Sequence, residues 1–236
     1  MKLLAVEGLE KRFGGVQALA GLSLTLDEGG LLCLLGPNGC GKTTFFRVLS
    51  GETRADAGRV DFAGERLDRQ GPAERARLGI ARKFQTPGLF AALTVAEHLA
   101  LGAASPAASR PVDPLSLLEQ GGLGDLAAVP AGRLAHGQRQ WLEIAMLLAL
   151  RPRLLLLDEP TAGMTVAETR RTAALIRTLN REHGVAAIVI EHDMAFVREL
   201  DVPIAVMLQG RIVATGSYAE VSRDPLVREL YLGRRA

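Results

Sequence analysis

The sequence predicts an α/β fold in which buried, mostly parallel strands alternate with helices. Four short apolar runs, LLCLLG, RLLLLDE, AAIVIEH and PIAVML, are typical of strands covered on both faces. Helical patterns lie between these runs, around residues 42–49, 165–181 and 193–200. No apolar run approaches the roughly 18–20 residues that a membrane-spanning helix needs. Together these patterns favour a soluble α/β protein.

In chain order, the first elements are expected to be three short strands, LLAVEGL, VQAL and LSLTL, separated by Gly-rich turns. The buried strand at 31–36 follows, and after it a helix over 42–49 that ends near Gly51. Residues 87–151 differ, because they contain helical stretches at 94–101, 114–120 and 138–150 but no clear strand. We interpret 87–151 as a helical subdomain inserted into a strand-rich core (1–86 and 152–236), all within a single domain, 1–236.

Composition excludes several classes of protein. The 28 Lys and Arg residues nearly balance the 26 Asp and Glu residues, giving a net charge of +2, so no general electrostatic attraction to nucleic acid is expected. Two cysteines are too few for a disulfide framework and suit a reducing compartment. The N-terminal residues do not resemble a secretory signal. We therefore expect an intracellular protein with no nucleic-acid partner.

A phosphate-binding loop is the most specific motif. Residues 36–43, GPNGCGKT, match the pattern G-x-x-x-x-G-K-[ST], with an apolar strand before them and a helix after them. In such a loop the backbone N–H groups surround phosphates, Lys42 reaches the β- and γ-phosphates, and the Thr43 hydroxyl binds Mg²⁺. The chain contains only four lysines, so a lysine at this position is not a chance filler.

Acidic residues end a second buried run, where LLLL is followed by Asp158 and Glu159. At the end of a strand, Asp158 can support the Mg²⁺ ion and Glu159 can polarise an attacking water. His192 follows the run AAIVI and is placed to contact a γ-phosphate. A GTPase is excluded, because no guanine-reading N-K-x-D motif follows the loop.

The order of five motifs resembles the ATP-binding subunits of ABC transporters. LAHGQ at 134–138 corresponds to the signature L-S-G-G-Q, and it precedes the strand that ends in Asp158 and Glu159. Gln85 in RKFQTP matches the Q-loop, and His192 in IEHDM matches the H-loop. Phe13 matches the aromatic residue that stacks on adenine. The resemblance covers the whole chain and implies a P-loop NTPase fold with an antiparallel β subdomain and an inserted helical subdomain.

The resemblance implies an ATPase that uses ATP and Mg²⁺. Two such domains face each other head to tail, and the signature of one completes the ATP site of the other. The implied catalytic residues are Glu159 as the general base, His192 and Gln85, and the implied metal ligands are Thr43, Gln85 and Asp158. The implied nucleotide-binding residues are Phe13, Gly36, Pro37, Asn38, Gly39, Cys40, Gly41, Lys42, Thr43 and Thr44. The implied signature residues, which act on the partner's ATP, are Leu134, Ala135, His136, Gly137 and Gln138.

This sequence departs from the family pattern at three positions. Ala135 replaces the signature serine, His136 replaces the next glycine, and Thr165 replaces the usual D-loop aspartate. Thr165 and Glu168 form the T-x-x-E pattern of a helix capping box. The departures affect the signature, whereas Lys42 and the residues of the chain's own hydrolytic site are unchanged.

Within the family, the terminal V-x-E-x-YLG pattern is similar to the ATPases of branched-chain amino acid importers. KFQTP, AHGQ-x-QWLEI and AGMT are most similar to the first ATP-binding subunit (the D subunit) of urea transporters. This resemblance implies a peripheral protein on the cytoplasmic face of the inner membrane that powers import of urea or short amides. Its implied partners are transmembrane permease subunits, a second ATP-binding subunit and, indirectly, a periplasmic substrate-binding protein.

Other interpretations remain open from the sequence. A branched-chain amino acid importer is the first alternative, and a non-transport ABC ATPase of the assembly or repair type is the second. A nucleotide-binding regulator with little hydrolysis is the third. Cys40 raises a separate hypothesis, because N–H groups aligned in the loop favour a reactive thiolate there.

Overall fold

Two sheets form the frame of the molecule. The computed structural model describes residues 1–83, 88–104, 119 and 123–232, and within them one sheet has four strands in the order β2-β1-β4-β5 and the other has six in the order β10-β9-β3-β8-β7-β6. Neighbours in the first sheet are antiparallel. Neighbours in the second are parallel, except that β10 runs antiparallel to β9. The strands are β1 (Lys2–Phe13), β2 (Val16–Asp27), β3 (Leu31–Leu35), β4 (Ala57–Phe62), β5 (Glu65–Arg66), β6 (Ile80–Arg82), β7 (Leu154–Asp158), β8 (Ala186–Ile190), β9 (Ile204–Leu208) and β10 (Arg211–Gly216).

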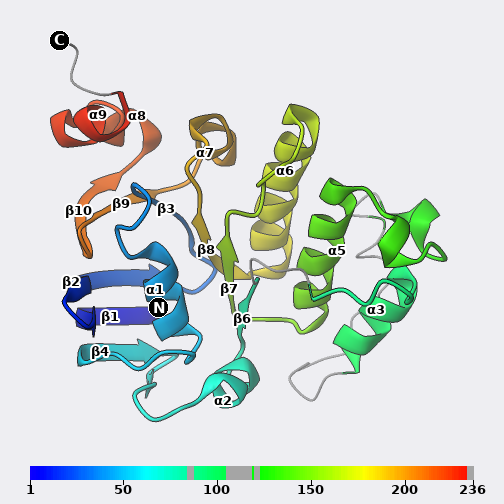
Figure 1. Cartoon of the computed structure of the whole chain (residues 1–236), viewed down its shortest axis with the longest axis horizontal. Coiled ribbons are helices and arrows are strands. Elements are labelled where there is room, and N and C mark those ends of the chain that lie inside the picture. Colours follow the sequence, from blue (N-terminus) through cyan, green and yellow to red (C-terminus); the bar gives the residue numbers. More distant parts are fainter. Residues whose placement is uncertain (84–87, 105–118, 120–122, 233–236) are drawn as a thin grey trace.

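Helices surround the six-stranded sheet. Their bounds are α1 (Lys42–Leu49), α2 (Pro72–Arg77), α3 (Val95–Ala103), α5 (His136–Ala149), α6 (Val166–His183), α7 (Met194–Leu200), α8 (Tyr218–Val221) and α9 (Pro225–Leu232), with 3₁₀ turns η1 (Gly124–Leu126) and η2 (Ala131–Arg133). Figure 1 shows α3 and α5 together at one side of the molecule, far from β1 and β2. None of the helices in the described part of the chain has the length and apolar character that crossing a membrane requires.

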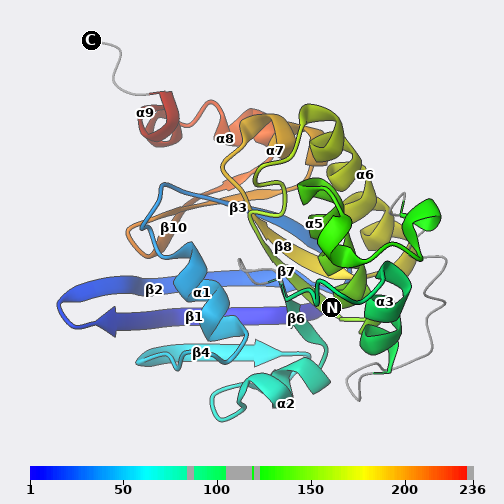
Figure 2. The same cartoon turned by 45° about the vertical axis from the view of Figure 1, so that its right-hand side comes forward.

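The buried strands serve two cores, because successive side chains of a strand point to opposite faces. On β7, Leu154 and Leu156 pack into a core shared with the antiparallel sheet and with the α1 residues Phe45 and Phe46. Leu155 and Leu157 pack into a second core, which is shared with α3, α5, α6 and α7. Figure 2 shows α1 and the antiparallel sheet on one side of β7 and β8, and α5 and α6 on the other. The ends of the central strands are therefore held from both faces.

The expected α/β architecture is confirmed, including the antiparallel β subdomain that the resemblance implied. The prediction of separate strands at VQAL and LSLTL is wrong, because both belong to β2. Leu9 pairs with Leu22 and Glu10 with Ala20, so Gly21, at φ +86°, is the extra residue of a bulge. Glycine adopts this conformation without a steric penalty, and a bulge bends a strand without ending it.

Several predicted boundaries in the helical part change. The helix expected over 138–150 is α5, which begins two residues earlier at His136. Among the described residues between 88 and 151, helices and 3₁₀ turns are accompanied by an isolated bridge between Thr94 and Pro130. The expected loop at 105–114 and most of the helix expected over 114–120 lie outside the described residues.

Candidate active site

The phosphate-binding loop joins β3 to α1 at the end of the six-stranded sheet. Its last glycine, Gly41, is the residue before α1 and has φ +109°. A Cβ at this position would lie 2.2 Å from the carbonyl oxygen of Ala18, and one at Gly36 would lie 2.3 Å from that of Met207. Real Cβ atoms do not approach so closely, so both positions require glycine. The glycine spacing of the motif therefore follows from packing against β2 and β9.

The Lys42 side chain is turned back into this loop. Its ammonium group donates hydrogen bonds to the carbonyl oxygens of Gly36, at 2.7 Å, and Pro37, at 3.0 Å. The residue is 7% exposed, so its charge is concentrated in the space that the loop surrounds. A phosphate entering this space would meet the ammonium group and the N-terminal end of α1.

Asp158 ends β7 beside the loop, and the residue is 3% exposed. Burial raises the pKa of its carboxyl group, and this effect is opposed chiefly by Arg82 and less by a hydrogen bond from the Thr43 hydroxyl. Arg82 comes from the adjacent strand β6 and has its Nη2 atom 3.7 Å from Asp158 Oδ2. This buried Oδ2 atom accepts no hydrogen bond within the described residues.

These oxygens fit a magnesium ion. Mg²⁺ usually takes one or two protein oxygens and completes its coordination with water and the phosphates of its substrate. A buried carboxylate oxygen without a hydrogen bond, next to the Thr43 hydroxyl, offers such a partial set of ligands. The part of the chain that the structure describes contains no group of three or more His, Cys, Asp or Glu residues able to hold a metal by themselves.

Glu159 and His192 come together at the ends of neighbouring strands. Glu159 Oε1 lies 3.4 Å from His192 Nδ1, and the two side chains are 32% and 62% exposed. The backbone N–H of Glu159 donates to the carbonyl oxygen of Ile190 at 2.9 Å, which ties the turn after β7 to the end of β8. Glu159 has φ +47°, an unusual value for a residue other than glycine. Such backbone conformations occur often at functional sites.

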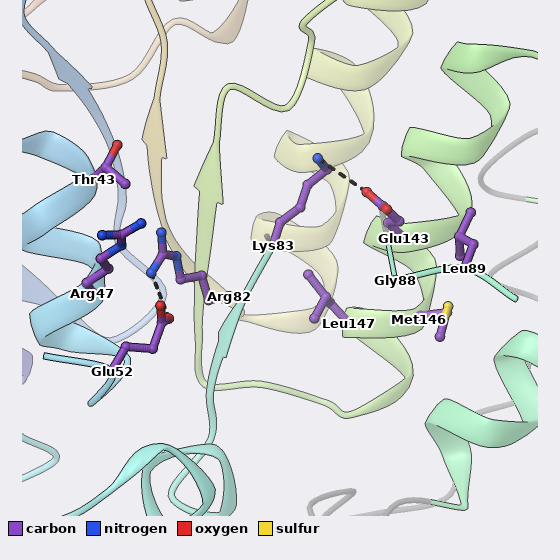
Figure 3. A pocket seen from close by; sticks show the side chains of 10 residues that line it. All are labelled: Thr43, Arg47, Glu52, Arg82, Lys83, Gly88, Leu89, Glu143, Met146 and Leu147. Carbon is purple, nitrogen blue, oxygen red and sulfur yellow. Dashed lines mark hydrogen bonds and ion pairs between the residues drawn. The ribbon is translucent and has the colours of Figure 1, made fainter. Parts of the chain in front are cut away.

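A cavity of about 560 Å³ opens between α1 and α5 (Figure 3). On one wall Arg82 pairs with Glu52 at 2.7 Å, and on the other Lys83 pairs with Glu143 of α5 at 3.3 Å. Burial raises the pKa of the Glu143 carboxyl group, with Lys83 opposing that effect. Gln85, which the sequence places two residues after Lys83, lies outside the described residues.

The signature residues form the beginning of α5. Ala135 is the residue before the helix, and its N–H donates to the side-chain oxygen of Gln138 at 2.9 Å. His136 is exposed, and its Nε2 atom lies 3.0 Å from the carbonyl oxygen of Ala162, in the D-loop. A Cβ on Gly137 would lie 2.2 Å from a carboxylate oxygen of Glu168. Leu134 is buried beneath this turn.

The structure separates the signature from the phosphate loop of the same chain. Figures 1 and 2 both show α1 and α5 on opposite sides of β7. In contrast, Lys42, Thr43, Asp158, Glu159 and His192 gather at one end of the sheet, as their positions at strand ends predict. The chain therefore has two candidate functional surfaces that are distinct in space.

Two other predicted residues differ in their surroundings. Phe13 ends β1 with 47% of its surface exposed and has the Lys11 ammonium group 5.4 Å from its ring centre, so its ring is accessible to a ligand. Cys40 is 5% exposed, and burial raises the pKa of its thiol, outweighing the opposite effect of Lys42. Both observations argue against the predicted reactive thiolate at Cys40, because desolvation favours the neutral thiol.

Sequence reasoning missed Glu52, Arg82, Glu143 and Glu191, which surround or support this site. Glu191 is 1% exposed and accepts hydrogen bonds from Thr161 and His192. Its position between an apolar strand and His192 was the only signal in the sequence, and that position alone does not distinguish it from a solvated acid.

Comparisons with known proteins agree with this geometry. Residues 19–162 match the model of the family "ABC transporter", and residues 211–236 match "Branched-chain amino acid ATP-binding cassette transporter". The high-affinity branched-chain amino acid transport ATP-binding protein BraF of Pseudomonas aeruginosa is 36% identical, over 98% of both chains. The corresponding protein LivG of Escherichia coli K12 is 34% identical, also over 98% of both chains.

Solved structures give the same result. MJ1267 in its ADP conformation, an ATP-binding cassette of an ABC transporter, superposes with a TM-score of 0.88 at 32% identity, over 99% of this chain and 100% of that one. The dimeric cassette MJ0796 has a TM-score of 0.80 at 23% identity, over 91% of this chain and 98% of that one, which supports the fold. The loop, the paired acids and these relatives lead to one conclusion: the chain belongs to the ABC transporter family and is an ATP-binding ATPase of its branched-chain amino acid type.

Proposed function

We propose that this ABC importer ATPase powers the uptake of branched-chain amino acids, by hydrolysing ATP with Glu159 as the general base. The observation that carries the mechanism is the 3.4 Å contact between Glu159 and His192, beside the buried Asp158 and the loop that holds Lys42. A carboxylate that is open to solvent and next to an imidazole can accept a proton from water. The phosphate loop fixes the γ-phosphate in front of them.

Each remaining residue has a role in this proposal. When ATP binds, the Lys42 ammonium group releases the carbonyl oxygens of Gly36 and Pro37 and donates hydrogen bonds to the β- and γ-phosphates instead. The exposed ring of Phe13 stacks on adenine. Thr43, Gln85 and Asp158 would hold Mg²⁺, which when bound neutralises phosphate charge and stabilises the transition state. His192 contacts the γ-phosphate and keeps Glu159 oriented.

The proposal about the transported cargo rests on the names of the relatives. BraF and LivG are named for branched-chain amino acid transport, and the C-terminal family match has the same name. None of the relatives described above is named for urea, so branched-chain amino acids replace urea and short amides as the proposed cargo. No residue of this chain touches the cargo in the proposal, because a permease carries it.

The proposed partners are two permease subunits, a second ATP-binding subunit and, indirectly, a periplasmic binding protein. The chain would then act at the cytoplasmic face of the inner membrane as one domain. The separation of the signature from the chain's own phosphate loop supports the need for a second ATP-binding subunit. In a head-to-tail pair, the N-terminus of α5 from one subunit would face the γ-phosphate bound to the other.

The hydrolysis mechanism is tested with Glu159→Gln, which keeps the shape of the side chain and removes the base. We expect ATP turnover to fall about 10²- to 10⁴-fold, as is usual when a general base is lost, with ATP affinity retained. Glu182→Gln, a change on the exposed surface of α6, is the control and should leave turnover unchanged. Undiminished turnover in Glu159→Gln would contradict the assignment.

The cargo is tested in vesicles that contain the chain with candidate permease subunits and a binding protein from the same organism. Stimulation of ATPase activity by leucine, isoleucine or valine supports the proposal. Stimulation by urea or short amides instead would contradict the proposed cargo but not the proposed mechanism of hydrolysis. A chain that neither co-purifies with a permease nor is stimulated by one would favour a non-transport ATPase.

A further inference from the structure

A buried carboxylate lies directly behind the Glu159–His192 pair. Glu191 follows the last residue of β8 and is 1% exposed. Its Oε1 atom accepts hydrogen bonds from the backbone N–H of Thr161, at 3.1 Å, and from the Thr161 hydroxyl, at 2.5 Å. Its Oε2 atom accepts from the backbone N–H of His192, at 3.2 Å. All three donors are neutral groups, so the carboxylate is stabilised by hydrogen bonds directed at its oxygens.

These contacts join the two loops that carry the reacting groups. Glu159 and Thr161 belong to the turn after β7, and His192 belongs to the loop after β8. A backbone hydrogen bond from Glu159 to Ile190 joins the two loops where they leave their strands. The hydrogen bonds between Glu191 and Thr161 join them again, two residues later in the loop after β7. With both bridges in place, neither loop can move alone without breaking a hydrogen bond to a buried acceptor.

Apart from the bridges, few contacts fix the reacting pair. The Glu159 side chain is partly exposed and that of His192 largely exposed, and their separation of 3.4 Å is longer than a typical hydrogen bond. Glu159 also has a left-handed backbone conformation, which relaxes unless its surroundings hold it. The backbone beneath the pair must therefore supply the rigidity that the side chains do not.

We propose that Glu191 is a positioning residue for ATP hydrolysis, which sets the distance between Glu159 and His192 by holding Thr161 and the backbone of His192. The inference rests on the roles proposed above for Glu159 and His192. Glu191 is 1% exposed and acts through the neighbours that it holds. A carboxylate is suited to this task because it only accepts hydrogen bonds, whereas an amide of the same shape would turn an N–H₂ group towards one of the donors.

The direct test is Glu191→Gln in the purified chain, assayed with MgATP. We expect kcat to fall about 10- to 100-fold, the range produced by displacements of about 1 Å, while KM changes less than about twofold. Thr161→Val removes the hydroxyl and should lower kcat less, and Thr161→Ser should restore it. The control is Glu220→Gln, because that carboxylate accepts the same kinds of bond from Ser217, at 2.7 and 2.8 Å, in an exposed helix cap. Its kcat should not change.

A second measurement separates positioning from general support of the fold. In the His192→Ala background, Glu191→Gln should lower kcat by a much smaller factor than in the wild type, because its effect passes through His192. An equal factor in both backgrounds, or an unchanged kcat in Glu191→Gln, overturns the inference. If Glu191→Gln fails to fold, the same comparison is made with Thr161→Val.

Failure of the inference can be distinguished from failure of the proposed function. An inactive Glu159→Gln together with an unaffected Glu191→Gln would reject only the role of Glu191. Full activity in Glu159→Gln would reject the proposed base, whatever Glu191 does.

Discussion

The two candidate functional surfaces of the chain are built in different ways. The surface proposed for hydrolysis, here called the hydrolytic surface, comprises 36–43, 158–159 and 192. It lies at the ends of buried parallel strands and contains groups such as Asp158 that are almost inaccessible. The signature surface, 134–138, is the first turn of one helix, and His136 on it is exposed. Strands packed on both faces allow little displacement, whereas a helix end can shift with its helix.

This difference explains where the sequence tolerates change. All the departures from the family pattern lie on or beside the signature surface, and the hydrolytic surface has none. A side chain that acts from an exposed helix end can be exchanged when its helix adjusts. A side chain at a buried strand end cannot, because several elements contact it. The contrast leads to five predictions, from the largest expected effect to the smallest.

The ion pair between Lys83 and Glu143 links the six-stranded sheet to α5, the helix that begins at the signature, because Lys83 follows β6 and Glu143 belongs to α5. Glu143→Leu should lower the free energy of unfolding by about 3–5 kcal/mol, because it leaves the Lys83 charge buried without its partner. The double change with Lys83→Met should recover most of this loss. Urea denaturation of the single and double variants measures both effects. Equal losses of stability in the single and double variants would mean that the buried Lys83 charge does not cause the loss.

Gly41→Ala tests the rigidity of the hydrolytic surface. Its Cβ would lie 2.2 Å from the Ala18 carbonyl oxygen at φ +109°, so we expect a loss of about 3 kcal/mol and no detectable ATP binding. Gly39→Ala is the matched control, because it also has a positive φ but no atom within 4 Å of its Cβ. It should cost about 1 kcal/mol. Similar losses for both would show that the loop can move.

Gly137→Ala is the corresponding test of the signature surface. Its Cβ would lie 2.2 Å from Glu168 Oε1, but this atom is the end of a side chain that can swing away. We expect a loss of about 1–2 kcal/mol, because Glu168 must abandon its capping box with Thr165. Glu168→Ala should cost a similar amount, and adding Gly137→Ala to it should cost little more. Thermal unfolding of the three variants checks this non-additivity.

His136→Ala removes the contact with the Ala162 carbonyl oxygen. Because the contact is exposed, the expected loss of stability is about 0.5–1 kcal/mol. ATP turnover of the isolated chain should change less than about twofold, and a larger change would link the signature directly to the D-loop. Parallel denaturation and ATPase measurements make the comparison.

Cys40 should show the smallest effect. Its raised pKa keeps the thiol protonated near neutral pH, so a thiol reagent should label it slowly, with or without MgATP. The Cys33→Ser variant leaves Cys40 as the only thiol. Labelling should accelerate only above the pH range in which an ordinary thiol ionises, or after unfolding in urea. Rapid labelling that MgATP prevents would restore the thiolate hypothesis.

Where local spacing determines the arrangement, the sequence predicted which residues lie together. Gly36, Gly41, Lys42 and Thr43 form one continuous loop, and the chemistry of phosphate binding determines their order. The ends of β7 and β8 could also be located, because wholly apolar runs stop there. Parallel strands bring such ends together, so the sequence alone could predict that Asp158, Glu159 and His192 lie close to one another.

Residues that act through distant contacts could not be predicted in the same way. Glu191 bonds Thr161, 30 residues away, and Arg82 pairs with Glu52 across the same separation of 30. Nothing next to these acids in the chain identifies their partners. Strand β10 was missed for another reason, because its half-exposed residues give no apolar run. Gly21 was read as a turn because a glycine in a bulge and a glycine in a turn look alike in sequence.

The left-handed backbone conformation at Glu159 implies a trade-off between the stability of the fold and ATPase activity at this one position. Glycine and asparagine adopt φ values near +47° with less strain than glutamate does, so either would relieve the backbone here. Both would also remove the carboxylate. A library of variants selected only for resistance to heat should therefore lose Glu159 early, and one selected for transport should keep it.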